Sequence, residues 1–130
     1  MKAELQFIGH IETPYNTLDE CPRNIDKHGP LCKLVIKDQF KEGLSGLVAG
    51  KKIAVLYWFE KVNRNACQQQ SRTSDKVAGV FALRTPNRPN PIAAATLVIE
   101  KIGANHILAK GLDCLNGTPL LDIKPAMSDE

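Results

Sequence analysis

The sequence has 130 residues, of which 43% are apolar and 24% are charged, and its formal net charge is +3. These values are typical of one globular domain that folds without disulfides or a structural metal. The charge excess is too small to indicate a nucleic-acid partner by itself.

The spacing of cysteines and histidines does not predict a metal site. No two cysteines form a C-x-x-C pair, and no histidine lies at ligand spacing from a cysteine. The N-terminal residues MKAELQFIGH lack the apolar core of a signal peptide, so we expect reduced thiols and a cytoplasmic protein. The longest apolar run, residues 53–59, is too short to cross a bilayer, which predicts no membrane partner.

The first half of the chain predicts three strands, at residues 4–12, 31–37 and 53–59. Residues 53–59 (IAVLYWF) are apolar on both faces, as in a strand that is covered on two sides. Residues 38–47 have helical character, and two glycines keep that helix short. The polar residues 63–76 predict a mobile loop.

The second half predicts three or four more strands, at residues 77–84, 96–102, 106–112 and 120–123. Turn residues at 103–105 and at Asn116-Gly117 separate the last three. Short strands without long helices favour a closed or nearly closed barrel, or a sandwich, over a doubly wound α/β fold. We therefore predict a mainly β protein, with a single barrel-like domain of six to seven strands and one short helix over residues 1–130.

The segment RTPNRPNPI at residues 84–92 carries a functional signal of its own. Its three prolines exclude a helix or a central strand and predict a stiff loop. Arg84 and Arg88 supply guanidinium groups, and Asn87 and Asn90 supply amides, which suit a polar ligand such as an adenosine or a carboxylate. A proline-stiffened surface turn is the alternative interpretation.

The segment GLDCLNGTPLLDIKP at residues 111–125 predicts, on its residues alone, a structural turn. Asn116-Gly117 can turn tightly, and Asp113 and Asp122 suit a turn cap and a salt-bridge partner of Lys124.

Together, these two segments resemble the TsaA-like family, and FIGHIETPY with Cys21-Pro22-Arg23 is similar to the opening strand and Pro-Arg-Gln loop of that family. The resemblance covers residues 7–125. It implies a β-barrel that binds S-adenosylmethionine near a homodimer interface. The best-known members methylate the exocyclic amine of threonylcarbamoyladenosine beside the tRNA anticodon.

The resemblance also implies a set of cofactor-binding positions. They are Arg23, Asn24, Phe59, Glu60, Arg84, Ala94, Asp113, Cys114, Leu115 and Asn116. The sequence departs from the family pattern at four places: Glu60 replaces a His, Ala-Ala-Ala at 93–95 replaces Gly-Leu-Ser, Asn116 replaces an Asp, and Ala126 replaces a Tyr.

The implied function is methylation of a modified adenosine in tRNA. An amine acceptor needs a nearby base, and Asp113 and Glu60 are the candidate catalytic carboxylates, with Asp122 also in a matched segment. The main alternative is a methyltransferase for a small-molecule acceptor, suggested by the short chain and the altered positions. A third possibility is a protein that binds S-adenosylmethionine without catalysis.

Overall fold

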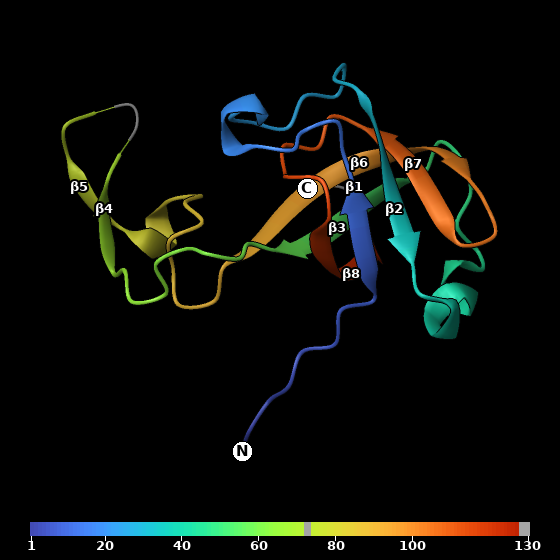
Figure 1. Ribbon diagram of the computed structural model, residues 1–130, viewed down its shortest axis with the longest axis horizontal. Coiled ribbons are helices and arrows are strands. Elements are labelled where there is room, and N and C mark those ends of the chain that lie inside the picture. The colour runs from blue at the N-terminus through green and yellow to red at the C-terminus, as the bar shows by residue number, and fades with distance from the viewer. Residues whose placement is uncertain (72–73, 128–130) are drawn as a thin grey trace. The chain divides into compact units, whose positions relative to one another are not determined.

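The computed structural model describes residues 1–71 and 74–127, and the regular secondary structure of these residues is mainly β-strand (Figure 1). The strands are β1 (Gly9–Glu12), β2 (Leu31–Ile36), β3 (Lys52–Trp58), β4 (Gln68–Gln70), β5 (Val77–Gly79), β6 (Ile92–Ile102), β7 (His106–Lys110) and β8 (Thr118–Pro125). Three short 3-10 helices are η1 (Leu18–Glu20), η2 (Asp38–Leu44) and η3 (Val80–Ala82). In the described part of the chain, no helix is long and apolar enough to span a membrane.

Six of the strands form a closed antiparallel barrel in the order β1-β2-β7-β6-β3-β8. β1 pairs with both β2 and β8, so that Ile11 lies opposite Leu34 on one side and Thr118 on the other. This closed barrel with short helices confirms the predicted fold class.

The core of the barrel consists of alternate strand residues that point inward. In β6, for example, Ala95, Leu97 and Ile99 are buried, and the residues between them are exposed. Each barrel strand contributes at least one side chain that is at most 1% exposed: Ile11, Leu34, Val55, Ile99, Ile107 and Leu120. Branched aliphatic side chains therefore fill the interior, as expected for a small barrel.

The contacts within the chain divide it into two compact units. The first unit contains residues 1–57 and the chain from Ala94 onward, and it includes most of the barrel. The second unit is Trp58–Ala93, with the two-stranded sheet of β4 and β5, helix η3 and the proline-rich loop. The sequence expectation that residues 1–130 form one domain stays a prediction.

Several predicted elements differ from the observed ones. The first strand begins at Gly9, five residues later than predicted. Residues 4–6 are exposed, and the first backbone hydrogen bond from this segment to β8 is donated by the Ile8 amide. The predicted strand 77–84 is replaced by the short strand β5 and helix η3, which end at Ala82. The predicted loop 63–76 contains β4, a strand of three glutamines. In β3, only one face is fully buried, since Ala54, Leu56 and Trp58 are partly exposed.

A backbone junction at Gly111 joins the loop after β1 to the end of β7. The Asp26 amide donates to the Gly111 carbonyl at 3.0 Å, and the Gly111 amide donates to the Pro30 carbonyl at 3.0 Å. Gly111 has a φ of 91°, and a Cβ there would overlap the carbonyl oxygen of Asp26. The position therefore requires glycine for both its conformation and its close packing.

We predict that Gly111→Ala destabilises the protein more than Gly46→Ala. Gly46 has a similar φ of 94°, but no atom lies within 4 Å of the Cβ position. The control should therefore lose only the cost of the left-handed conformation, about 1–2 kcal/mol. Gly111→Ala should lose ~2 kcal/mol more, because the Asp26 carbonyl must move. Urea unfolding measures both variants, and equal losses would contradict the junction.

Candidate functional site

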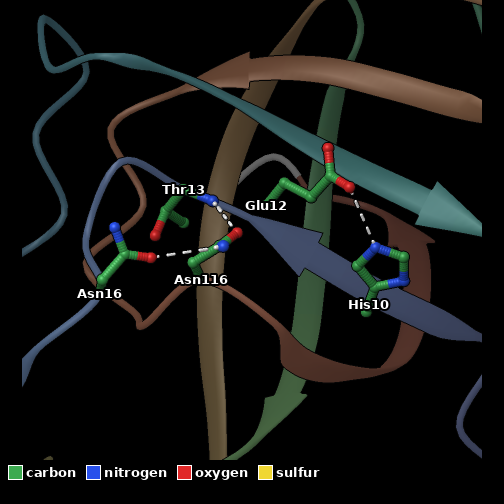
Figure 2. Close-up of polar contacts among 5 residues, drawn as sticks. All are labelled: His10, Glu12, Thr13, Asn16 and Asn116. Carbon is green, nitrogen blue, oxygen red and sulfur yellow. Dashed lines mark hydrogen bonds and ion pairs between the residues drawn. The ribbon is translucent and has the colours of Figure 1, made fainter.

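A turn at residues 111–117 joins β7 to β8 and contains four of the predicted cofactor-binding positions. Asn116 ties this turn to the segment that follows β1 (Figure 2). Its amide donates to the Tyr15 carbonyl at 2.7 Å. Its side chain accepts a hydrogen bond from the Thr13 amide at 3.2 Å and donates to Asn16 Oδ1 at 3.5 Å. The Asn that replaces the family's Asp thus uses both its donor and its acceptor.

Two threonine hydroxyl groups bind carbonyl oxygens of this turn. Thr13 Oγ1 donates to the Cys114 carbonyl at 2.8 Å and accepts from the Tyr15 amide at 3.2 Å. Thr118 Oγ1 donates to the Leu115 carbonyl at 2.6 Å. These bonds fix the backbone of the turn without using the Asp113 carboxylate.

The Cys114 thiol is part of the core. Its residue is 1% exposed, and burial raises the pKa of the thiol to about 12. Burial also raises the pKa of Cys32, whose residue is 2% exposed. Both thiols are therefore protonated at neutral pH, and neither supplies a thiolate nucleophile.

The Asp113 carboxylate is held in place by a buried tyrosine. Tyr57, at the end of β3, is 2% exposed, and its hydroxyl donates to Asp113 Oδ1 at 2.8 Å. Asp113 itself is half-buried. Among the described residues, no hydrogen bond to Asp113 Oδ2 is observed. The arrangement leaves one carboxylate oxygen oriented and available to a ligand.

The loop between β1 and β2 contributes two further predicted positions to the same unit. Arg23 and Asn24 are exposed, and they precede Asp26, which bonds to Gly111 at the start of the turn. Ala94 is an exposed residue of β6. The first unit thus holds Arg23, Asn24, Ala94 and the four residues Asp113, Cys114, Leu115 and Asn116.

The other predicted positions, Phe59, Glu60 and Arg84, belong to the second unit. Glu60 and Arg84 are exposed, and the Phe59 amide donates to the Pro91 carbonyl at 2.9 Å. Lys61, next to Glu60, has a positive φ of 57°, which is uncommon for a lysine.

The proline-rich loop is held by its own polar side chains. Arg88 donates to the carbonyls of Leu83 and Thr85, at 3.0 Å each. Asn87 donates to Gln69 Oε1 at 3.2 Å and accepts from the Asn63 amide at 3.0 Å. The sequence suggested these side chains as ligand groups, but Arg88 and Asn87 bind the loop and its neighbours.

Arg64 also binds the proline-rich loop. Arg64 Nε donates to the Pro89 carbonyl at 2.8 Å, and its guanidinium lies 5.1 Å from the centre of the Trp58 ring. Its Nη2 also donates to Asn90 Oδ1 at 3.4 Å. The loop is therefore stiffened by hydrogen bonds as well as by proline.

Sequence reasoning missed Tyr57 and Thr13. A tyrosine at an inward position of an apolar strand needs a polar partner for its hydroxyl, and this signal could have pointed to a nearby carboxylate. Thr13 directly follows a strand, where threonine often binds backbone groups. Their partners are distant in sequence, so the pattern alone names neither Asp113 nor Cys114.

Comparison with known proteins identifies relatives along almost the whole chain. A probable S-adenosyl-L-methionine-binding protein, VirR of Rhizobium radiobacter, is 40% identical over 126 residues, which are 97% of this chain and 72% of VirR. The mouse tRNA (adenine(37)-N6)-methyltransferase is 32% identical over 130 residues, which cover 94% of this chain and 30% of the mouse protein.

Comparison with solved structures identifies proteins of similar fold. The crystal structure of TrmO from Pseudomonas aeruginosa superposes with a TM-score of 0.75 at 28% identity, covering 98% of this chain and 57% of that one. The family model for the tRNA-methyltransferase O N-terminal domain matches residues 10–129, which confirms the TsaA-like resemblance. On this match, the chain belongs to the family of the tRNA-methyltransferase O N-terminal domain.

Proposed function

We propose that this protein binds S-adenosylmethionine beside Asp113 and transfers its methyl group to the exocyclic amine of a modified adenosine in tRNA. The observation that carries the proposal is the half-buried Asp113 carboxylate, which Tyr57 orients at 2.8 Å within a turn of this family's domain. Relatives named as S-adenosyl-L-methionine-binding proteins and as tRNA adenine methyltransferases support it.

The groups of the first unit fit the cofactor chemically. A fixed carboxylate suits the hydroxyl groups of a ribose or the ammonium group of a methionine moiety. Arg23 and Asn24 add an exposed cation and an amide in the loop joined to Gly111. Arg84 belongs to the second unit, and it is a position that the family resemblance implies for the cofactor. These assignments of cofactor-binding residues are part of the proposal.

When bound, S-adenosylmethionine supplies an electrophilic methyl group on a positively charged sulfur. The residues of this chain then have two tasks: they align the acceptor amine and take up its proton. We place Asp113 at the cofactor, since Tyr57 already occupies one of its oxygens. For the base that takes up the proton, Asp113 is the first candidate, and we propose the exposed Glu60 as the second.

We predict that Asp113→Asn weakens S-adenosylmethionine binding. Loss of a charge-assisted hydrogen bond costs about 1.5–3 kcal/mol, or roughly 10- to 100-fold in Kd. Tyr57→Phe should weaken binding less, about 3- to 10-fold, because the carboxylate stays but is no longer oriented. The matched control is Asp122→Asn, which removes a half-buried carboxylate that pairs with Lys124 at 3.8 Å.

Isothermal calorimetry measures these affinities without requiring an acceptor. The double variant Tyr57→Phe/Asp113→Asn should be no weaker than Asp113→Asn alone, because Tyr57 acts through Asp113. Independent, additive losses would exclude Tyr57 as a positioning residue. An unchanged affinity in Asp113→Asn would remove Asp113 from the site.

We predict that the protein transfers a labelled methyl group from S-adenosylmethionine to tRNA. Digestion of the tRNA and mass spectrometry should find the label on a modified adenosine. Label found only in a small-metabolite extract would replace tRNA with a small-molecule acceptor. Cofactor binding without transfer to either would favour a binding protein, the description that VirR carries.

We also propose that the protein is a homodimer acting in the cytoplasm. Closed two-fold pairs are the commonest oligomers. Light scattering should report about twice the monomer mass of 14.3 kDa at micromolar concentration. A monomer both with and without S-adenosylmethionine would contradict the dimer.

A further inference from the structure

A groove of about 530 Å³ crosses the outer face of the first unit. Its floor includes Val98 of β6, which is 45% exposed between the buried residues Leu97 and Ile99. Ile99 pairs with Ala109 of β7, so continuation of this antiparallel register brings Lys110 beside Val98. The groove thus has an apolar floor at the centre of a strand and a cation at its side.

Three lysines and one histidine line the groove around this floor. Lys110, Lys52 at the start of β3, and Lys27 and His28 in the loop before β2 all line the groove and are exposed. One carboxylate, Glu100, lines it with them. Across residues 1–71 and 74–127, no ion pair involves any of these lysines. Among the described residues, the groove therefore holds three lysines against one carboxylate, and none of these lysines is in an ion pair.

The groove shares two segments with the candidate cofactor site. Lys110 directly precedes Gly111, where the turn that contains Asp113 begins. Lys27 and His28 follow Asp26, whose amide binds the Gly111 carbonyl. A nucleic acid that presents a base to the site would continue its backbone over neighbouring surface, and this groove is a neighbouring concave surface of positive charge.

We propose that this groove binds the sugar–phosphate backbone of the RNA that accepts the methyl group, an inference that rests on the proposed function. The three lysines place ammonium groups where phosphates can release their counter-ions, and Val98 offers an apolar contact to a ribose. Glu100 opposes the phosphates, so it limits the affinity. The groove contributes binding strength and register, whereas the base is recognised at the methyl-transfer site.

The test compares RNA binding by variants of equal net charge. Lys52→Gln/Lys110→Gln removes two cations of the groove, and Lys2→Gln/Lys41→Gln removes two exposed cations elsewhere in the chain. Fluorescence anisotropy with a labelled anticodon stem-loop RNA gives Kd over a series of salt concentrations. Calorimetry with S-adenosylmethionine and thermal unfolding confirm that each variant is folded and binds cofactor.

We expect the groove variant to bind the RNA about tenfold more weakly or worse, with the slope of log K against log salt reduced by about 2. The control should change little, and Glu100→Gln should bind more tightly than the wild type. Equal effects of the two lysine pairs, or no gain in Glu100→Gln, would overturn the groove while the wild type still methylates tRNA. A wild type that neither binds nor methylates RNA would overturn the groove and the tRNA acceptor together.

Discussion

Pairing of β1 with β8 closes the barrel and leaves no free edge among its six strands. Closure also fixes which side chains point inward, because neighbouring residues of a strand alternate between the two faces. Inward positions such as Ile11, Leu34 and Leu120 are completely buried. A barrel this small is filled by its own side chains, so a ligand as large as S-adenosylmethionine must bind to loops and outer faces.

That constraint explains why so many polar side chains in the loops bind other loops. In the turn 111–117, the hydroxyl groups of Thr13 and Thr118 donate to backbone carbonyls. The Asn116 and Gly117 amides donate to the carbonyls of Tyr15 and Ile11. Side chains also bind carbonyls in the second unit, where Arg88 and Arg64 donate to the Thr85 and Pro89 carbonyls of the proline-rich loop. Loops that are already fixed lose less entropy when a ligand binds, so these contacts favour binding at the loops.

The barrel was largely predictable from the sequence, because period-two alternation marks strands such as β2 and β6 directly. β4 could not be recognised, since its three glutamines have no apolar alternation, although they pair with β5. The proline-rich loop was predicted correctly as a loop, but the task of Arg88 was not. The sequence alone does not distinguish an arginine that binds backbone carbonyls from an arginine that binds a ligand.

The candidate site was predictable only as a set of positions. Motif resemblance located Asp113, but its orientation depends on Tyr57, which is 56 residues earlier in the chain. No local pattern encodes that pair, because barrel closure brings β3 beside β8 and hence beside the turn that precedes β8. The family resemblance therefore identifies a functional side chain such as Asp113, whereas the fold supplies the partner that orients it.

Gly111 lies between the candidate cofactor site and the groove that we propose for RNA. Its carbonyl and amide hold the loop that carries Arg23 and Lys27, while its own position starts the turn that carries Asp113. Both segments are irregular, and irregular segments otherwise open at low free-energy cost. A residue without a side chain allows the two backbones to approach closely enough to bond. One glycine thus connects the turn that contains Asp113 to the loop whose Lys27 lines the groove.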